Sequence, residues 1–390
     1  MVTVAFFSSH PYHRKTVSRV DELRSDGVTV YLAAFTRTSF QTDSIRSDNY
    51  FDIGPSTDGK YLQRLLRLPQ YVWRSVRIAR SFKECDVIWA NTLDTLFLAL
   101  VARPFISGRR SVIYDVADLT GLQLAGHPAS RLLRSIEKMM CRAISGLIVT
   151  SPWYYWTYYW GRLGVEAPAY LLENKVSAPL PARSSIGGQV PWRILWHGSL
   201  RCASSFSTLV QLATTLPDLV EIHCWGSADT IGERLRDRSL RPTNIKYHGV
   251  YDDAEIEAIF EGIHFVFAFD IDDGENSKML LPNRLYHGVA RGIPVIAVGD
   301  SAIGNVVQEH LAGATFDSPL SANLISYFKN LSPATYLALQ GGISDKLRGA
   351  AVYTGDVTRL LRCFTGDATI PALPADESIA VVLAGPPSEF

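Results

Sequence analysis

The stretch NSKMLLPNRLYHGVARGIPVIAV, residues 276–298, reads as a loop, a helix, a turn and a buried strand. Pro282 and Asn283 suit the start of the helix, where the Asn283 side chain can cap free backbone amides. Gly292 suits its end, and Pro294 lies just beyond. A helix followed closely by a short apolar run is typical of a parallel sheet whose strands are buried on both faces.

This helix carries a cationic face that a glycine interrupts. The face consists of residues spaced three, four and seven positions from the first, namely Arg284, His287, Gly288 and Arg291. A cation in the first turn opposes the helix dipole, so Arg284 requires a compensating anion. Gly288 costs about 1 kcal/mol relative to alanine inside a helix, which indicates that something packs closely against it. We therefore expect this face to hold an anionic ligand such as a diphosphate.

The alternation of apolar runs and helical stretches extends through the whole chain. Strand-like runs lie at residues 2–9, 28–35, 86–91, 111–116 and 146–151, and again at 193–200, 220–226, 245–250, 264–270 and 294–298. Strands separated by helices predict right-handed crossovers in a parallel sheet. The fold class is therefore α/β, with two Rossmann-like, doubly wound parallel-sheet domains that we expect to face each other across a ligand-binding cleft.

The predicted domain boundaries follow composition. A Pro-, Gly- and Ser-rich stretch breaks the pattern and predicts a linker. We expect an acceptor-binding domain over 1–172, a linker over 173–191, a donor-binding domain over 192–345, a C-terminal helix over 346–365 that can pack back, and a flexible tail over 366–390.

Two further turns in the second half have glycine directly after a strand. Gly198, in HGSLR (197–201), permits close backbone approach ahead of a helix whose amides can meet a phosphate. Gly249 opens a second strand–glycine–helix unit, with a helix expected over 252–262. A glycine after a strand can also be nothing more than a turn.

These segments together resemble a known family. LPNRLYHGVARGIPVIA (281–297), RILWHGSLR (193–201) and IKYHGVYDDAEIEAIFEGIHFVFA (245–268) are similar to the donor-binding segments of GT-B glycosyltransferases. The resemblance implies a nucleotide-sugar donor, with Arg284 in place of a lysine that faces the diphosphate or a sugar carboxylate. It also implies that His287 stands in place of a glutamate that holds the ribose. The implied donor-binding residues are Gly198, Ser199, Arg201, Gly249, Asn283, Arg284, His287 and Gly288.

The resemblance also bears on stereochemistry. Retaining members carry two glutamates eight positions apart, but Met279 and His287 occupy those positions here, which favours an inverting transfer. An inverting transfer needs a general base on the first domain. The segment VIYDVADLTG (112–121), with Asp115 and Asp118, resembles the catalytic loop of the membrane-associated glucuronosyltransferase of xanthan assembly. Asp118 is the predicted base; His10, in a similar Ser-Ser-His start, is the second candidate.

No cofactor and no metal are expected. The Asp-x-Asp within residues 270–273 could hold a metal, but its late position predicts an acidic loop instead. Five cysteines show no paired spacing, so we expect neither a disulfide framework nor a zinc site.

Several features predict contact with an anionic membrane. Up to residue 172 the chain has 21 basic and 14 acidic residues, whereas the remainder is acidic. Residues 60–83 hold seven basic and no acidic side chains among large apolar ones, and WYYWTYYW (153–160) is almost wholly aromatic, which suits a headgroup layer, a packed helix or an acceptor-stacking surface. No signal peptide is expected. The protein is predicted to lie on the cytoplasmic face of the cell membrane, with a lipid-linked or glycan acceptor.

Other functions remain open from the sequence. A nucleotide-sugar epimerase on the same fold would need no acceptor surface, and a catalytically silent nucleotide-sugar-binding partner would need no base. A nucleic-acid binder is suggested only by the basic first half, and we do not expect nucleic acid as a partner.

Overall fold

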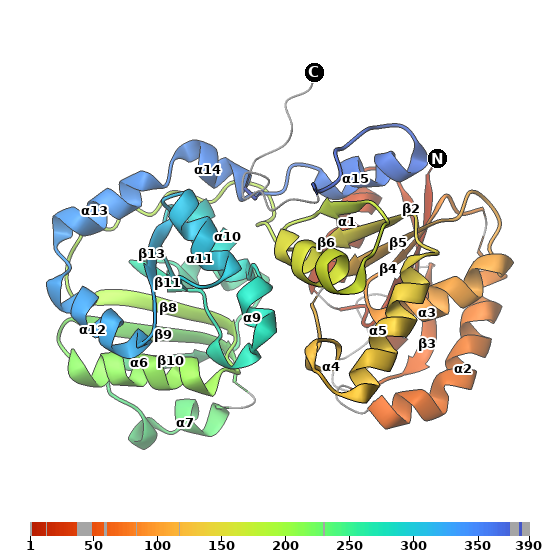
Figure 1. Cartoon of the computed structure of the whole chain (residues 1–390). Coiled ribbons are helices and arrows are strands. Elements are labelled where there is room, and N and C mark those ends of the chain that lie inside the picture. Colours follow the sequence, from red (N-terminus) through yellow and green to blue (C-terminus); the bar gives the residue numbers. More distant parts are fainter. Residues whose placement is uncertain are drawn as a thin grey trace. The chain divides into compact units, whose positions relative to one another are not determined.

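The computed structural model describes residues 2–12, 14–36, 49–57, 61–82, 84–116, 118–228, 231–374 and 382–383. The chain forms two compact units, one of residues 1–172 with 355–377 and the other of residues 173–354 with 378–390. Each unit is built on one parallel sheet with helical crossovers (Figure 1). The predicted pair of doubly wound α/β domains is therefore confirmed.

The first unit has a seven-stranded sheet in the order β3-β2-β1-β4-β5-β6-β7. Its strands are β1 (Thr3–Ser8), β2 (Thr29–Thr36), β3 (Tyr50–Pro55), β4 (Val87–Ala90), β5 (Ser111–Val116), β6 (Gly146–Val149) and β7 (Ala169–Leu171). Its helices are α1 (Arg14–Ser25), α2 (Tyr61–Ala79), α3 (Leu93–Ala102), α4 (Gly121–Leu124), α5 (Pro128–Cys141), the π-helix η2 (Tyr154–Leu163) and α15 (Asp356–Thr365). The central strand β4 is fully buried and β1 is buried except at Thr3, as their continuous apolar runs predict.

The second unit has a six-stranded sheet in the order β10-β9-β8-β11-β12-β13. Its strands are β8 (Trp192–Ser199), β9 (Val220–Ser227), β10 (Ile245–Gly249), β11 (Phe265–Phe267), β12 (Val295–Val298) and β13 (Gly313–Phe316). Its helices are α6 (Ala203–Thr215), α7 (Gly232–Arg236), α8 (Ile256–Ile259), α9 (Glu275–Met279), α10 (Asn283–Ala290), α11 (Ala302–Glu309), α12 (Leu320–Asn330), α13 (Pro333–Gly342) and α14 (Asp345–Ala350). The helix expected over 252–262 is shorter: a 3₁₀ turn precedes the four residues of α8.

The C-terminal part differs from the sequence expectation. In place of one helix over 346–365, α14 belongs to the second unit and α15 to the first. Within residues 366–374 of the predicted flexible tail, Leu373 is buried, its amide donates to the Ala169 carbonyl (2.7 Å), and the Trp156 indole donates to the Pro374 carbonyl (2.9 Å). Residues 375–381 and 384–390 of the predicted tail lie outside the described residues.

Each sheet has a switch point, where the strand order reverses. In the first unit it lies between β1 and β4, and in the second between β8 and β11. Ligands of open parallel sheets bind outside the carboxyl ends of the strands at such points. The two switch points are therefore where functional side chains should be sought.

Candidate functional site

The turn after β8 lies at the switch point of the second unit. Gly198 has φ +97°, and a Cβ placed there would meet no atom within 4 Å, so the open space beside it could admit a ligand. Ser199 and Arg201 follow it and are exposed. Gly249, at the end of β10, has φ +93° and equally open surroundings.

Arg284 lies at the same edge, in the first turn of α10. Its side chain is 9% exposed, and its guanidinium forms a bidentate pair with Asp270, with Nη1–Oδ1 and Nη2–Oδ2 distances of 3.2 and 2.8 Å. Asp270 follows β11 by a few residues, so the anion that the sequence required for Arg284 is supplied within the chain. The acidic loop expected at 270–273 thus has a charge partner at its first residue.

A small hollow lies beside this ion pair. Asp270 forms part of its wall, together with apolar and hydroxyl groups from the loop after β11 and from α9 to α11. Its lining residues are Ala268, Phe269, Asp270, Ser277, Leu280, Pro282 and Ile303.

His287 lies in a layer of stacked rings instead of on an open face. Its ring stacks on Phe260 (centroids 5.7 Å apart) and meets His197 edge-on (5.5 Å), while Nδ1 is 3.1 Å from the Arg291 guanidinium. Arg291 itself contacts Phe260 and Glu257. The cationic face read from the sequence is therefore buried, and its charges are paired.

Gly288 and Asn283, both predicted to contact the donor, lie in different surroundings on α10. A Cβ at Gly288 would come within 2.9 Å of Val295 and 3.3 Å of Val266, so close helix–sheet packing accounts for this glycine. Asn283 does not cap α10, because Pro282 holds the N-cap position with no side-chain cap. Asn283 is instead the exposed first residue of the helix.

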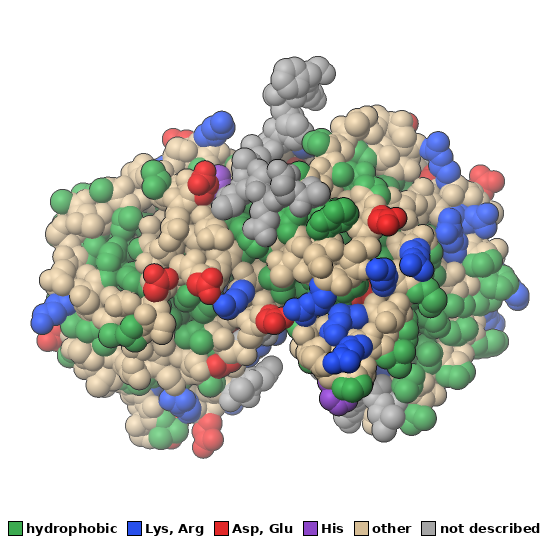
Figure 2. Space-filling view, in the orientation of Figure 1, with side chains coloured by type: hydrophobic (Ala, Val, Ile, Leu, Met, Phe, Trp, Pro, Cys, Tyr) green, Lys and Arg blue, Asp and Glu red, His purple; other side chains and the backbone are tan. Residues whose placement is uncertain are grey.

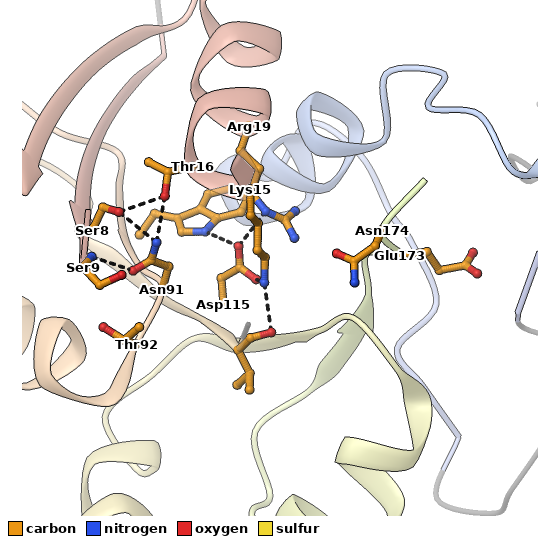
Figure 3. Close-up of polar contacts among 12 residues, drawn as sticks. Ser8, Ser9, Lys15, Thr16, Arg19, Asn91, Thr92, Asp115, Glu173 and Asn174 are labelled. Atoms are coloured by element: carbon orange, nitrogen blue, oxygen red, sulfur yellow. Dashed lines mark hydrogen bonds and ion pairs between the residues drawn. The ribbon is translucent and has the colours of Figure 1, made fainter. Parts of the chain in front are cut away.

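At the switch point of the first unit, α1 meets the end of β5 through a buried ionic cluster. The Asp115 carboxylate lies 2.7 Å from Lys15 Nζ and 2.9 Å from Arg19 Nε, and it accepts a 3.0 Å bond from the Trp89 indole (Figure 3). Lys15 also donates to the Val116 carbonyl (2.9 Å). The cluster fixes the strand end from which the Asp118 segment departs.

Burial and charge act in opposite directions on the pKa values of this cluster. Burial alone would raise the pKa of the Asp115 carboxyl, but Arg19, Lys15 and Trp89 together hold it below its ordinary value. Burial lowers the pKa of the Lys15 ammonium to about 8, although Asp115 opposes the change. A fully buried, ion-paired Asp115 is not placed to take a proton from a substrate.

A hydrogen-bonded network occupies the ends of β1 and β4. The Asn91 amide donates to the hydroxyls of Ser8 (2.9 Å) and Thr16 (3.0 Å) and accepts from the Ser9 amide (3.0 Å) (Figure 3). His10, in the same loop, is 3% exposed, and its Nδ1 accepts from the Tyr12 amide (3.0 Å). His10 is thus held inside this loop.

Asp118 is exposed, in contrast to Asp115, and lies two residues beyond β5. Its Oδ1 accepts a 3.3 Å hydrogen bond from the Tyr154 hydroxyl. It does not cap the following helix, because Thr120 is the N-cap of α4. Of the two aspartates in this segment, Asp118 is the one that an acceptor hydroxyl could reach.

The aromatic segment 153–160 is mainly core, not surface. Apart from Thr157 and Trp160, its side chains are buried, most of them within η2. A membrane belt or an acceptor-stacking surface over this segment is therefore wrong. The third possibility left open by the sequence, a packed helix, is the one observed.

Several residues at these sites were not found from the sequence. Each of these assignments depends on tertiary contacts: Asp270 pairs with Arg284, Lys15 and Arg19 pair with Asp115, and Tyr154 lies beside Asp118. The sequence held a signal for the Lys15 and Arg19 pair, because the two residues are four apart and so share one side of a predicted helix. Within the described ranges, no group of three or more His, Cys, Asp or Glu side chains is arranged to hold a metal.

Comparison with known proteins gives relatives over nearly the whole chain. No family model matches. The chain is 27% identical to the succinoglycan biosynthesis protein ExoL of Rhizobium meliloti over 356 residues, which is 87% of this chain and 86% of ExoL. Among solved structures, a sucrose-phosphate synthase from Thermosynechococcus elongatus superposes with a TM-score of 0.72 at 13% identity, covering 94% and 99% of the two chains. Anabaena HepE in complex with UDP-glucose gives 0.69 at 14% identity, covering 94% and 99%.

Proposed function

We propose that this chain is a GT-B glycosyltransferase, because its motifs resemble that family and its fold matches solved structures of sugar-nucleotide enzymes. It transfers a sugar from a UDP-sugar to a lipid-linked glycan in exopolysaccharide synthesis, with inversion. The observation that carries the donor half is Arg284, a buried cation at the amino end of a helix at a switch point. HepE binds UDP-glucose on the same fold, and ExoL belongs by its name to succinoglycan biosynthesis.

In the proposed donor complex, the diphosphate replaces Asp270 as the partner of Arg284. A phosphate and a carboxylate both accept paired bonds from a guanidinium, so the exchange keeps the cation compensated. Asp270 is then released toward the adjacent hollow, where it can accept from a donor hydroxyl. The turns at Gly198 and Gly249 leave room for backbone approach to the nucleotide.

The transfer itself needs one base and one leaving-group site. Asp118 takes the proton from the acceptor hydroxyl as its oxygen attacks the anomeric carbon of the sugar. The bond from that carbon to the diphosphate breaks, and the electron pair leaves with UDP. Arg284 and the amides at the amino end of α10 stabilise the charge that develops on the diphosphate.

The donor assignment is tested by binding. Arg284→Met is expected to weaken UDP binding about 10- to 100-fold, because hydrogen bonds to a charged group contribute about 1.5–3 kcal/mol. Thermal shift against a panel of nucleotide sugars, followed by titration of UDP, measures the effect, since a ligand that binds only the folded chain raises Tm.

Two further variants control this experiment. Asp270→Asn removes the internal competitor, so it should bind UDP at least as tightly as the wild type, and Arg238→Ala, an exposed position, should change nothing. If Arg284→Met binds UDP as well as the wild type does, the donor site is elsewhere.

A membrane-proximal acceptor is supported by α2. This helix exposes Leu65, Leu66 and Trp73 by 63%, 74% and 59%, beside Arg64 and Arg67. Hydrophobic side chains gather with basic ones over this part of the unit (Figure 2). Such a helix suits the surface of an anionic bilayer. The outer ends of the predicted basic segment, Lys60 and Lys83, lie outside the described residues, and no described helix is long and apolar enough to span a bilayer.

Replacing Leu65, Leu66 and Trp73 together by serine is expected to reduce binding to anionic vesicles roughly tenfold or more, because apolar area no longer enters the headgroup layer. Flotation with phosphatidylglycerol-containing and pure phosphatidylcholine vesicles measures it. Leu337→Ser, at an exposed leucine of the second unit, is the matched control. Unchanged flotation of the triple variant would refute this surface.

A further inference from the structure

Three tyrosine hydroxyls of η2 donate hydrogen bonds to carboxylates, one in the segment that follows β5 and one on α5. Tyr154 donates to Asp118 Oδ1 (3.3 Å), while Tyr158 and Tyr159 donate to the Glu137 carboxylate on α5 (2.6 and 3.0 Å). All three side chains are almost completely buried. A buried tyrosine needs a partner for its hydroxyl, but here one partner is the exposed carboxylate that we assign as the base.

The π-helical winding accounts for how tyrosines of one helix reach the carboxylates of both Asp118 and Glu137. A π-helix closes i→i+5 hydrogen bonds, so residues four and five apart turn to the same side. Tyr158 and Tyr159 stand four and five residues after Tyr154, and the wider turn brings all three to one face. In an α-helix, Tyr159 would point well away from Tyr154. π-Helical turns are rare and occur frequently at functional sites.

Glu137 extends this support to the rest of the segment. Its carboxylate accepts from the Gln123 side chain (2.9 and 3.1 Å), and Gln123 closes a capping box with Thr120 at the start of α4. Arg162, at the end of η2, donates to the Leu124 carbonyl (3.0 Å). Residues 118–124 are therefore held along one side by η2 and by the acid that η2 supports.

We propose that Tyr154 is the positioning residue for Asp118, and that η2 is the platform that sets this carboxylate against the acceptor hydroxyl. The inference rests on the proposed role of Asp118 as base. Lys15 secures the other end of the segment by its bond to the Val116 carbonyl. A base held from both sides meets its substrate in one orientation, and small displacements of a catalytic group are costly.

Tyr154→Phe removes only the hydroxyl, and Tyr155→Phe is its matched control. Tyr155 is buried in the same helix, and it donates no hydrogen bond to residues 118–124, all of which the structure describes. The assay follows UDP release from the UDP-sugar that binds best in the thermal-shift panel, with a butanol extract of bacterial membranes as acceptor. Tyr154→Phe should lower kcat about 10- to 100-fold at unchanged donor KM. Tyr155→Phe should stay within about twofold.

The pH profile separates positioning from a structural role. Loss of the donated hydrogen bond disfavours the ionised Asp118 carboxylate, so the acid limb of kcat/KM should move to higher pH in Tyr154→Phe. Lys15, the nearby cation, is present in both the wild type and the variant and does not contribute to this difference. Tyr155→Phe should leave the limb in place. An unmoved limb together with an unchanged kcat in Tyr154→Phe would overturn the proposal.

A double variant distinguishes an error in the role of Tyr154 from an error in the assignment of Asp118 as the base. In an Asp118→Asn background, Tyr154→Phe should cause no further loss, because the carboxylate on which it acts is gone. An equal fractional loss in both backgrounds would show that Tyr154 acts elsewhere. Full activity of Asp118→Asn alone would overturn the base, and this inference with it, while leaving the donor site to the Arg284 test.

Discussion

Asp118→Asn is expected to lower kcat for sugar transfer by about 10²- to 10⁴-fold, the usual contribution of a general base. Asparagine keeps the size of the side chain and can still accept from Tyr154, but it takes up no proton. Binding of the UDP-sugar should be unchanged, since Asp118 and Arg284 belong to different units. The loss should therefore appear in kcat and not in the thermal shift given by the donor.

The measurement is UDP release with and without the membrane extract, and Asp21→Asn, at an exposed position of α1, is the matched control. Wild-type turnover in Asp118→Asn would mean that another group is the base, with His10 next to be tested. Conversion of the UDP-sugar without any acceptor would point to an epimerase. A wild-type protein that binds donor but never turns it over would point to a silent binding partner.

The second large effect is on stability. Asp115→Asn is expected to lower the free energy of unfolding of the first unit by about 3–5 kcal/mol, because it leaves two buried cations without their counter-charge. Urea unfolding followed by tryptophan fluorescence measures it, since the Trp89 indole bonds to this carboxylate. Asp52→Asn weakens a pair with Arg74 that is partly exposed, and it should cost less than about 1 kcal/mol.

At strongly acidic pH, the free energies of unfolding of the wild type and of Asp115→Asn should become equal. The folded-state pKa of Asp115 lies below the ordinary 3.8, so its ionic contribution is present above 3.8 and is lost as pH falls through the lower folded value. The two unfolding curves should therefore converge in strong acid. Equal stability at neutral pH would instead mean that Asp115 contributes nothing through its charge.

Much of the fold could be predicted because its determinants are local. The buried strands are apolar runs bounded by glycine, proline or charge, and α10 ends at Ala290, shortly before Gly292 with its positive φ, as the sequence indicates. The short edge strands β3, β7 and β13 were not predicted, because three to six residues without a distinctive pattern carry little signal.

The sites could be predicted only in part, because position along the chain does not determine pairing. Arg284 was expected to require an anion, but nothing local names Asp270, fourteen residues earlier, as that anion. For the aromatic run of 153–160 the sequence left a surface and a packed helix both open, since composition alone does not reveal π-helical winding. Asp115 and Asp118 looked alike in sequence, and burial separates them: one is enclosed by two cations and the other is open to solvent.

The return of α15 to the first unit has a practical consequence for dissecting this enzyme. Glu22 on α1 accepts the first amides of α15, those of Val357 and Thr358, and Leu360 and Leu361 are buried. A fragment that ends at residue 172 would lack α15. It would expose the apolar surface that α15 covers on α1 and leave the Glu22 carboxylate without the α15 amides. An autonomous version of the first unit should therefore join residues 355–377 to residues 1–172 instead of ending at 172.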